Sequence, residues 1–421
     1  MKYKESIVGF IPDEWDEIEI NELIKMGIIE GVLDGNHGAI HPTSADYVDK
    51  GIPFIMANNL GSGKVDLENC KFITVDLSKT LMKGFAKTGD VLLTHKGTIG
   101  ETAIVPEVNP YIVLTPQVTY YRISNCERLD NKYLKYYFDQ ENYQSMLTRL
   151  SAQSTRAYIG ITQQKKLSIV IPPLPEQKKI AMILSTVDGH IDEVDGMIED
   201  LKELKKGLMQ KLLTEGIGHT EFKDSEVGRI PVEWEVKTLD EVAEFFNGKG
   251  HEKNVSEDGH YIIVNSKFIS TEGEVIKRSD ECLFPLIKGD VTMVMSDVPN
   301  GKAIAKTYLI EEDNKYTLNQ RICCLRTNDM DSRFLSYITS RNLYFLKFDD
   351  GNKQTNLRKS EVLDFKLQVP PFKEQKMIAD ILDSLQNHIV QYESLLFQTK
   401  ELKKGLMQHL LTGKKRVTVN E

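Results

Sequence analysis

The stretch KELKKGLMQ occurs twice in this chain, at Lys202–Gln210 and again at Lys400–Gln408. Nine identical residues in a row do not recur by chance in a chain of 421 residues. Two copies are too few for a solenoid, in which several short repeats stack on one another. The stretch therefore indicates a chain that is internally duplicated.

The identity extends to both sides of KELKKGLMQ at a constant offset of 198 residues (370 − 172). PPLPEQKKIA at Pro172–Ala181 matches PPFKEQKMIA at Pro370–Ala379, and the same LLT follows each copy of KELKKGLMQ after one further residue. Of the 43 aligned positions, 23 are identical. The duplicated unit is thus much longer than the nine residues that reveal it.

A second pair of similar segments lies upstream of these, with an offset of 219 residues (223 − 4). KESIVGFIPDEWDEIEI covers Lys4–Ile20, and KDSEVGRIPVEWEVKTL covers Lys223–Leu239. Each copy places Gly-x-Ile-Pro before Glu-Trp, which predicts a turn leading into a buried tryptophan and a short strand. The favoured interpretation of this element is structural rather than chemical.

The residues after each Pro-Pro pair are patterned as one long helix, which we expect to begin near Pro175 and near Lys373. Apolar residues recur there at alternating spacings of four and three, the heptad pattern of a left-handed coiled coil. Roughly 38 residues span about 57 Å at 1.5 Å per residue, too far for an adjoining small domain to cover. We therefore expect the two helices to pack on each other. The heptad positions are Ile180, Leu184, Val187, Ile191, Val194, Ile198 and Leu201, then Ile378, Leu382, Leu385, Ile389, Tyr392 and Leu396.

Gly207 and Gly405 fall at matching positions inside these helices. Each costs about 1 kcal/mol relative to alanine in a helix interior. The matched pair indicates a close approach of the helices or a shared bend. The alternative is that each helix ends earlier and a separate short helix follows.

Between the repeated stretches lie two segments that differ from each other in sequence. Both follow one plan: short strands broken by glycine-rich turns, a helix, a polar stretch and a last strand. Three tyrosines in the predicted helix of the first segment are expected to be core residues rather than a base-stacking platform. In the first segment the predicted strands are Gly51–Leu60, Val91–Val105, Val118–Ile123 and Leu167–Pro172, with a helix at Asn131–Leu150, a polar stretch at Ser151–Lys166, and tyrosines Tyr133, Tyr136 and Tyr137. In the second they are Tyr261–Ser266, Asp290–Ser296, Leu318–Arg326 and Phe365–Pro370, with a helix at Ser332–Phe348 and a polar stretch at Gly351–Glu361.

The predicted fold class is α+β, with two globular α/β domains, two long helices and an internal repeat. The same architecture with different surface residues is typical of a pair of recognition modules. The boundaries that follow are a first recognition domain at 1–171, a central spacer helix at 172–214, a second recognition domain at 215–369, a C-terminal spacer helix at 370–412 and a tail at 413–421.

Bulk composition narrows the function classes. The chain has 27% charged and 40% hydrophobic residues and contains no apolar run of about 18 residues, so we expect a cytoplasmic protein with no membrane partner. Its five cysteines are odd in number and lack CxxC spacing, which favours small core residues over disulfides or a zinc site. A net charge of −9 argues against a nucleic-acid partner, although a basic groove can lie on an acidic body.

Catalytic patterns are incomplete wherever they begin. Asn109-Pro110-Tyr111 lacks the second proline of the amino-methyltransferase motif, and no glycine-rich cofactor turn accompanies it. Gly61-Ser62-Gly63-Lys64 lacks the first glycine of a phosphate loop, and Val65 replaces the Ser/Thr that would reach magnesium. The sequence contains no His/Cys cluster with metal-ligand spacing and no Gly-x-Ser-x-Gly elbow. We therefore expect no catalytic site, no bound metal and no cofactor on this chain.

The ordered set of repeated elements resembles the specificity subunits of type I restriction–modification systems. The elements are the Pro-Pro-x-x-Glu-Gln starts, the long helices and the Gly-x-Ile-Pro…Glu-Trp openings, and the resemblance covers essentially the whole chain. Further family-like stretches are GDVLLTHKGTIGETAIV at Gly89–Val105, LNQRI at Leu318–Ile322 and GNKQTNLRKSEVLDFKLQVPP at Gly351–Pro371.

The resemblance implies a non-catalytic DNA-recognition subunit. Each of two target-recognition domains would read one half of a bipartite, asymmetric site in double-stranded DNA, and the helices would form an antiparallel coiled coil between them. Two modification (methyltransferase) subunits would dock on the helices, and restriction/translocase subunits would join them. The partners would carry S-adenosylmethionine, ATP and magnesium. Duplicated domains related by a near-twofold axis suit the two strands of DNA, and helix length would set the spacing of the half-sites. The partner would flip the target adenine out of the stack.

Polar loops within each recognition domain are the candidates for DNA contact, since base edges are read by Gln, Asn, Arg, Lys, Ser and Thr. The alternative for each residue is an ordinary solvated turn, and Lys or Arg can equally touch phosphates. The candidates in the first domain are Thr94, His95, Lys96, Thr98, Gln153, Ser154, Thr155, Arg156 and Tyr158. Those in the second are Ser296, Asn300, Lys353, Gln354, Asn356 and Arg358.

Two other hypotheses remain open at this stage. The chain can be an interaction scaffold whose duplicated domains bind protein, which the acidic net charge favours. It can also be an enzyme with an unrecognised site, which turnover by the purified chain alone would reveal. Equal binding to random and target DNA separates the scaffold from a specificity subunit.

Overall fold

The computed structural model describes residues 2–37, 39–152, 157–298, 301–349, 351 and 354–418. These residues form two compact units. The first unit comprises Met1–Asp195 with Ser394–Glu421, and the second comprises Gly196–Glu393. The division falls inside the two long helices, so each unit contains a part of both.

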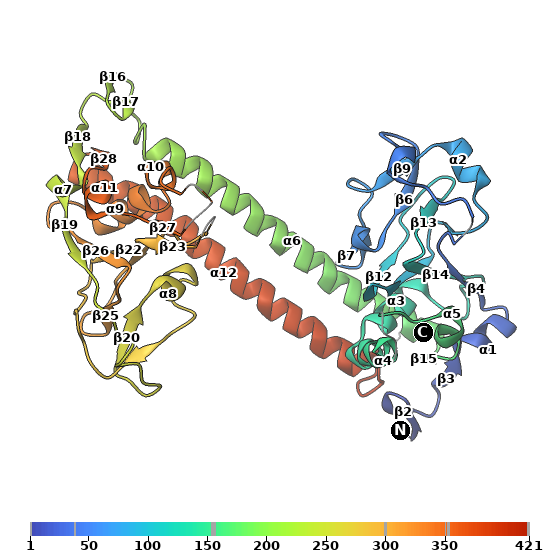
Figure 1. The fold of residues 1–421 in the computed structure, drawn as a ribbon. Coiled ribbons are helices and arrows are strands. Elements are labelled where there is room, and N and C mark those ends of the chain that lie inside the picture. The colour runs from blue at the N-terminus through green and yellow to red at the C-terminus, as the bar shows by residue number, and fades with distance from the viewer. Residues whose placement is uncertain are drawn as a thin grey trace. The chain divides into compact units, whose positions relative to one another are not determined.

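The first unit builds its globular part from short strands and helices that follow the chain from blue to green in Figure 1. Up to α2 the elements are β1 Tyr3–Ser6, β2 Gly9–Pro12, β3 Asp16–Glu19, α1 Ile20–Lys25, β4 Ile29–Asp34, the 3₁₀ turn Ser44–Asp46, β5 Tyr47–Val48, β6 Ile52–Ile55, the 3₁₀ turn Ala57–Asn59, β7 Leu60–Gly61, β8 Lys64–Val65, β9 Lys71–Ile73 and α2 Val75–Thr80. The rest are β10 Phe85–Ala86, β11 Val91–Lys96, β12 Thr98–Ile104, β13 Ile112–Leu114, β14 Val118–Ile123, α3 Asn131–Asp139, α4 Glu141–Ser151, α5 Ile161–Lys165 and β15 Ser168–Ile171.

The second unit repeats this order with fewer strands. Its first elements are β16 Phe222–Ser225, β17 Gly228–Pro231, β18 Glu235–Thr238, α7 Leu239–Val242, β19 Glu244–Asn247, β20 Tyr261–Val264, α8 Ser266–Ser270, β21 Arg278–Ser279 and β22 Val291–Val294. The remaining elements are β23 Ser296–Asp297, β24 Thr307–Leu309, β25 Tyr316–Leu318, β26 Ile322–Arg326, α9 Ser332–Thr339, α10 Leu343–Leu346, β27 Thr355–Asn356, α11 Lys359–Leu363 and β28 Lys366–Val369.

The main strand pairings are shared by the two units. An antiparallel four-stranded sheet has the order β12-β11-β14-β4 in the first unit and β24-β22-β26-β19 in the second. A parallel pair lies beside it, β6 with β13 and β20 with β25. The last strand of each globular part pairs with the strand after the buried tryptophan, β15 with β3 and β28 with β18. The duplication therefore extends through the segments whose sequences differ.

A glycine in each unit is required by a close approach of two chain segments. The N–H of Gly35 donates to the Val118 carbonyl (3.0 Å), and that of Gly248 donates to the Ile322 carbonyl (3.1 Å). A Cβ atom at either glycine would lie 1.9 Å from a backbone carbonyl oxygen. The two positions are structurally equivalent, although the sequence around them gives no such indication.

An aspartate–arginine pair braces the central sheet in both units. Arg122 donates to Asp90 through Nε (3.0 Å) and Nη2 (2.8 Å), and Arg326 donates to Asp290 through the same two nitrogens (2.7 and 2.8 Å). Both aspartates are buried, and these bidentate bonds raise the pKa of each arginine.

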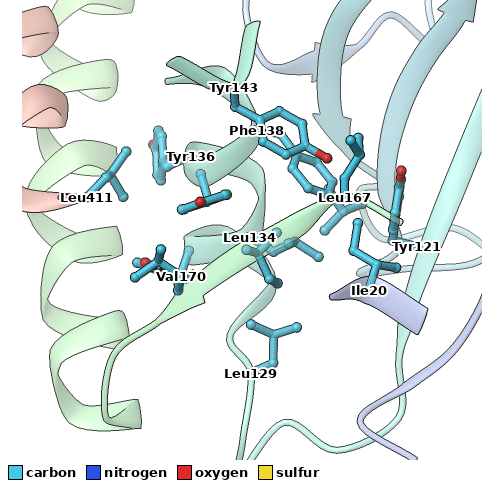
Figure 2. Packing of buried hydrophobic residues seen from close by; sticks show 14 of the residues in the cluster. Ile20, Tyr121, Leu129, Leu134, Tyr136, Phe138, Tyr143, Leu167, Val170 and Leu411 are labelled. Atoms are coloured by element: carbon cyan, nitrogen blue, oxygen red, sulfur yellow. Dashed lines mark hydrogen bonds between the residues drawn. The ribbon is translucent and has the colours of Figure 1, made fainter. Parts of the chain in front are cut away.

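The core of the first unit joins the globular part to the ends of the long helices. Tyr133, Tyr136 and Tyr137 are buried in it, which confirms that this cluster is core. Figure 2 shows Leu411, which directly follows helix α12 (Phe372–Leu410), on the same side of the cluster as Tyr136. The hydroxyl of Tyr133 donates to the Val170 carbonyl (2.8 Å), so this core contains satisfied polar groups as well as apolar contacts.

The long helices are α6, Leu174–Leu212, and α12, Phe372–Leu410, each 39 residues. In the first unit Lys403 Nζ of α12 lies 2.6 Å from Asp188 Oδ1 of α6. In the second unit Lys202 pairs with Glu393 and Lys205 with Gln386, so one residue number falls as the other rises. The helix portions within each unit therefore pack antiparallel, and every predicted heptad residue is buried or half-buried.

Each long helix is followed by a glycine in the left-handed conformation, Gly216 and Gly413, both with φ of 68°. A basic side chain then reaches the glutamate of Pro-Pro-x-x-Glu-Gln. Arg416 Nε donates to Glu176 Oε2 (2.7 Å), and His219 Nε2 lies 2.9 Å from Glu374 Oε1. The tail of the chain and the linker after α6 thus make equivalent contacts.

Most predicted elements are confirmed, and two helices need correction. The helix expected over Asn131–Leu150 is two helices, α3 and α4, because Gln140 between them is extended. The helix expected over Ser332–Phe348 ends at Thr339, and α10 follows after a turn. In both cases a bend lets the apolar faces of two short helices reach the same core.

Two of the explanations offered for Gly207 and Gly405, an early helix end and a close approach, are wrong, and a shared bend stays a prediction. Both helices continue through these glycines, so neither ends early. A Cβ atom at either position would meet nothing within 4 Å among the described residues, so no close approach requires them.

The cysteines fit the predicted core role only in part. Cys70, Cys323 and Cys324 are buried, whereas Cys126 is exposed and Cys282 is half-buried. Burial raises the pKa of Cys323 to about 12, so its thiol stays protonated at neutral pH. In the described part of the chain, no helix combines the length and apolar character needed to cross a membrane.

Candidate nucleic-acid interface

The first candidate surface lies where β11 turns into β12. Lys96 ends β11, Thr98 begins β12, and both are exposed. Tyr158, 62 residues later (158 − 96), forms an isolated antiparallel bridge with Lys96. The Ile159 N–H donates to the His95 carbonyl (3.0 Å) and fixes this pairing. The structure therefore brings Lys96, Thr98 and Tyr158 together on one surface.

Thr94 and His95 are corrected from contact residues to supporting residues, because both are fully buried. Thr94 Oγ1 accepts from the Glu101 N–H (2.9 Å) across the β11–β12 turn. His95 Nδ1 lies 3.0 Å from the Ile159 carbonyl, and its Nε2 lies 3.3 Å from Asp34 Oδ1. Burial lowers the pKa of His95 although Asp34 opposes this shift, so the ring is neutral near pH 7.

The second candidate surface lies where β23 pairs with β27. Ser296 is opposite Asn356 in this pairing, and Gln354 Nε2 donates to Ser296 Oγ (2.6 Å). Gln354, Asn356 and Arg358 are exposed, and the Arg358 side chain retains 82% of its accessible surface. Ser296 is itself buried, so it holds Gln354 in place.

The two surfaces are at equivalent positions in their units. The Leu357 N–H donates to the Met295 carbonyl (2.8 Å), as Ile159 does to His95. Leu357 and Ile159 are 198 residues apart (357 − 159), the same offset as that of the long helices. Tyr158 therefore corresponds to Asn356. The sequence selected the loops of each unit separately, and the fold shows that they occupy equivalent positions in the two units.

Six candidates lie outside the described residues. They are Gln153, Ser154, Thr155, Arg156, Asn300 and Lys353. Their roles remain predictions from the sequence.

The sequence profile of the family described as "Type I restriction modification DNA specificity domain" matches residues 12–203 and 231–396. Its two matched regions follow the internal duplication. The chain belongs to this family.

Two relatives in this specificity family align with almost the full length of the chain. The type I restriction enzyme MjaVIII specificity subunit of Methanocaldococcus jannaschii is 28% identical, over 97% of this chain and 94% of its own. The putative type I restriction enzyme MjaX specificity subunit of the same organism is 27% identical, over 99% and 97%.

Solved structures share the fold at low sequence identity. The S subunit of the type I restriction–modification system from M. genitalium has a TM-score of 0.59 at 16% identity, covering 95% of this chain and 96% of its own. A chain from a study of complex assembly and conformational transition of the type I R-M system has a TM-score of 0.54 at 14% identity, covering 96% and 99%. These likenesses support the fold class: two α/β globular parts with two long helices.

Sequence reasoning missed Gln117 and Arg321, which adjoin the two surfaces. The His95 N–H donates to the Gln117 carbonyl (2.9 Å), and the Met295 N–H donates to the Arg321 carbonyl (2.8 Å). Both side chains are exposed, and Arg321 has a positive φ of 70° that turns the chain there. The only sequence sign is a polar residue just before a buried strand, which is too common to select them.

Proposed function

We propose that this chain is the DNA-specificity subunit of a type I restriction–modification enzyme. Each of its two candidate surfaces reads one half of a bipartite, asymmetric site in double-stranded DNA. The observation that carries the proposal is that equivalent backbone frames in the two units present different polar side chains at equivalent places. Such a pair of surfaces suits two half-sites of different sequence.

The proposed contacts in the first domain are made by Lys96, Thr98, Tyr158 and the adjoining Gln117. Those in the second domain are made by Gln354, Asn356, Arg358 and the adjoining Arg321. Amide side chains can bond adenine edges in pairs, and arginine can do the same with guanine, whereas lysine can equally hold a phosphate. The candidates outside the described residues, Gln153–Arg156, Asn300 and Lys353, belong to the same loops in sequence.

The chain carries no chemistry of its own in this proposal. No group of three or more His, Cys, Asp or Glu side chains that could hold a metal ion is found among the described residues. S-adenosylmethionine, ATP and magnesium are assigned to partner subunits, and a cytoplasmic location follows from that partnership.

Two modification subunits are proposed to dock on the repeated KELKKGLMQ stretches, with restriction subunits joining the complex. Helix packing does not explain why exposed residues are identical in both copies. Leu204 is 50% exposed and its counterpart Leu402 is 57% exposed. Exposed identical leucines suit two copies of one partner, each contacting one stretch.

Domain exchange tests the proposal most directly. The full chain, reconstituted with its modification subunits, is given segment Asp240–Val369 of a relative, and methylated adenines are mapped across a genome. We expect one half-site to change and the other to stay. Methylation without any consistent bipartite sequence would sink the proposal.

Two smaller changes separate the surfaces from the helices. Asn356→Ala should weaken the preference at the second half-site only, by about 1–3 kcal/mol at one base position. Inserting seven residues in both long helices should lengthen the spacer and leave both half-sites as they are. A changed half-site in the insertion variant would contradict the spacer role of the helices.

The acidic net charge favours a second candidate function, a scaffold that binds protein partners only. Binding of the reconstituted complex to target and random duplexes at several salt concentrations separates the two. A specificity subunit discriminates between the duplexes, and its affinity falls steeply as salt rises. A scaffold does neither.

A further inference from the structure

Lys205 and Lys403 occupy the same position in the two copies of KELKKGLMQ, and they are less exposed than the lysines beside them. The next lysines, Lys206 and Lys404, are exposed. An identical lysine that points away from water twice needs a repeated partner inside each unit. In both units the ammonium bonds a side chain of the other long helix and lies near a tyrosine ring of the globular part.

In the first unit Tyr136 of α3 connects the globular part to both long helices. Its hydroxyl donates to Asp188 Oδ2 of α6 (2.6 Å). Lys403 of α12 lies 2.6 Å from Asp188 Oδ1, and its ammonium is 5.7 Å from the centre of the Tyr136 ring. Tyr136 is only 4% exposed, and Figure 2 shows its ring at the edge of the core nearest the helices.

In the second unit Tyr337 of α9 has the equivalent role. Its hydroxyl donates to Asp383 Oδ1 of α12 (2.6 Å). Lys205 of α6 donates to Gln386 Oε1 (2.6 Å), and its ammonium is 5.4 Å from the centre of the Tyr337 ring. Gln386 corresponds to Asp188 at the offset of 198 (386 − 188). The side chain that the lysine bonds is a carboxylate in the first unit and an amide in the second. The position of the lysine beside the tyrosine ring is the same in both.

These contacts differ in kind from the apolar packing around them. Leucine and isoleucine contacts tolerate sliding and rotation, whereas a hydrogen bond to a carboxylate is short and directional. Burial lowers the pKa of Lys205, as expected for an ammonium drawn out of water toward an aromatic face. Each set thus fixes the rotation of one helix of the globular part against the helix pair.

We propose that Tyr136 and Tyr337 are positioning residues that set the angle at which each recognition domain is held on the long helices, and thereby the half-site spacing that the chain accepts. The proposal rests on the proposed function as a DNA-specificity subunit. It makes spacer stringency a property of two tyrosine–lysine–acid sets as well as of helix length. The bases read at each half-site do not depend on these residues.

The test uses the full chain reconstituted with its modification subunits and compares Tyr136→Phe and Tyr337→Phe with the natural chain. The substrates are duplexes with both half-sites unchanged and the spacer shortened or lengthened by one base pair. We expect methylation of the altered spacers, relative to the preferred one, to rise at least about tenfold, the lower end of the factor by which one hydrogen bond to a charged group shifts an equilibrium. Base preference within each half-site should not change.

Tyr133→Phe is the matched control. It removes a hydroxyl from the same helix and the same core, but the bond lost goes to the Val170 carbonyl within the globular part. The spacer ratio of this variant should equal that of the natural chain. If the Tyr133→Phe control relaxes the spacer as much as Tyr136→Phe does, loss of core order explains the effect and the proposal fails.

Lys403→Met provides a second variant if Tyr136→Phe does not fold, because it keeps a stem of similar length and removes the ammonium group. It should relax the spacer in the same direction. Unchanged spacer ratios in folded Tyr136→Phe, Tyr337→Phe and Lys403→Met chains would overturn the inference and leave the proposed function intact. A natural complex that methylates no bipartite sequence would instead overturn both.

Discussion

Trp15 in the first unit and Trp234 in the second are both fully buried at equivalent positions of the Gly-x-Ile-Pro…Glu-Trp repeat. Trp234 Nε1 donates to Glu374 Oε2 (3.0 Å). Trp15 Nε1 is buried without a hydrogen-bond partner among the described residues, and the corresponding Glu176 bonds Arg416 instead. The same glutamate of the repeat thus satisfies different groups in the two units.

This difference teaches how the duplicated chain has diverged. Backbone contacts, such as those of Gly35 and Gly248, are the same in both units, since a change there would move a whole strand. Side-chain partners at the same places have been exchanged, because a hydrogen bond needs only some donor within reach. Divergence in the polar contacts of a fixed frame is also what the two recognition surfaces display.

The largest effect is expected at the buried aspartates of the central sheets. Asp290→Ala removes the bidentate partner of Arg326 and should cost about 3–5 kcal/mol in the free energy of unfolding of the second unit, because a cation loses its buried partner. Asp90→Ala should cost less. Arg122 keeps the Phe85 carbonyl (2.8 Å), and Glu30 lies 3.8 Å away.

The chain itself supplies the measurement, since it has two tryptophans, one in each unit. Urea unfolding followed by fluorescence, in chains that retain only Trp15 or only Trp234, reports each unit separately. An equal loss for the two aspartate variants would show that the extra partners of Arg122 contribute nothing.

The next largest loss of stability is expected at the two glycines where chain segments approach closely. Gly35→Ala and Gly248→Ala place a methyl group 1.9 Å from a backbone carbonyl, so each should cost about 3 kcal/mol as strands are pushed apart. The cost should be similar in the two units because the geometry is the same. Gly31→Ala in β4 is the control, since its Cβ would make only ordinary contacts at 3.5 Å or more. Tolerance of alanine at Gly248 alone would break the equivalence of the frames.

A smaller difference is expected between the tryptophans themselves. Trp15→Phe and Trp234→Phe lose similar apolar contacts, but only the second loses a hydrogen bond to a carboxylate. Trp234→Phe should therefore cost about 1.5 kcal/mol more. Differential scanning calorimetry of the two variants measures the difference. A greater loss for Trp15→Phe would mean that its indole N–H has a partner in solution.

The smallest effect is expected at the exposed pair Lys202–Glu393 of the helices. The two side chains are 55% and 47% exposed, so Lys202→Ala should change stability by less than about 1 kcal/mol. It is a useful contrast to Lys403→Met at the half-buried Lys403–Asp188 contact. A large loss of stability in Lys202→Ala, measured in the same calorimeter, would show that the exposed pair contributes to the packing of the helices.

Much of the fold followed from local pattern. The start of each long helix was predicted to within one residue, since proline punctuation and heptad spacing act over short distances. Strand β14 was predicted at its observed bounds, Val118–Ile123. The helix breaks at Gln140 and after Thr339 were not predicted, because they depend on the shape of a core that is assembled from distant segments.

The candidate site was predictable only as a set of loops. Lys96 and Tyr158 lie 62 residues apart, and the backbone bond that brings their neighbours together leaves no mark in the sequence. Thr94 and His95 are adjacent in β11, so their side chains point to opposite faces of the sheet, and only the fold decides that both faces are covered.

The sequence by itself determined that the chain is duplicated, that two long helices carry the identical stretches, and which family it belongs to. Repetition and helical period are properties of the order of residues, so they survive without coordinates. The tertiary structure decided that the two dissimilar segments are one frame, that Tyr158 and Asn356 are equivalent, and that a lysine of each KELKKGLMQ stretch lies against a tyrosine. Those facts depend on contacts between residues far apart in the chain, and such contacts exist only after the core has formed.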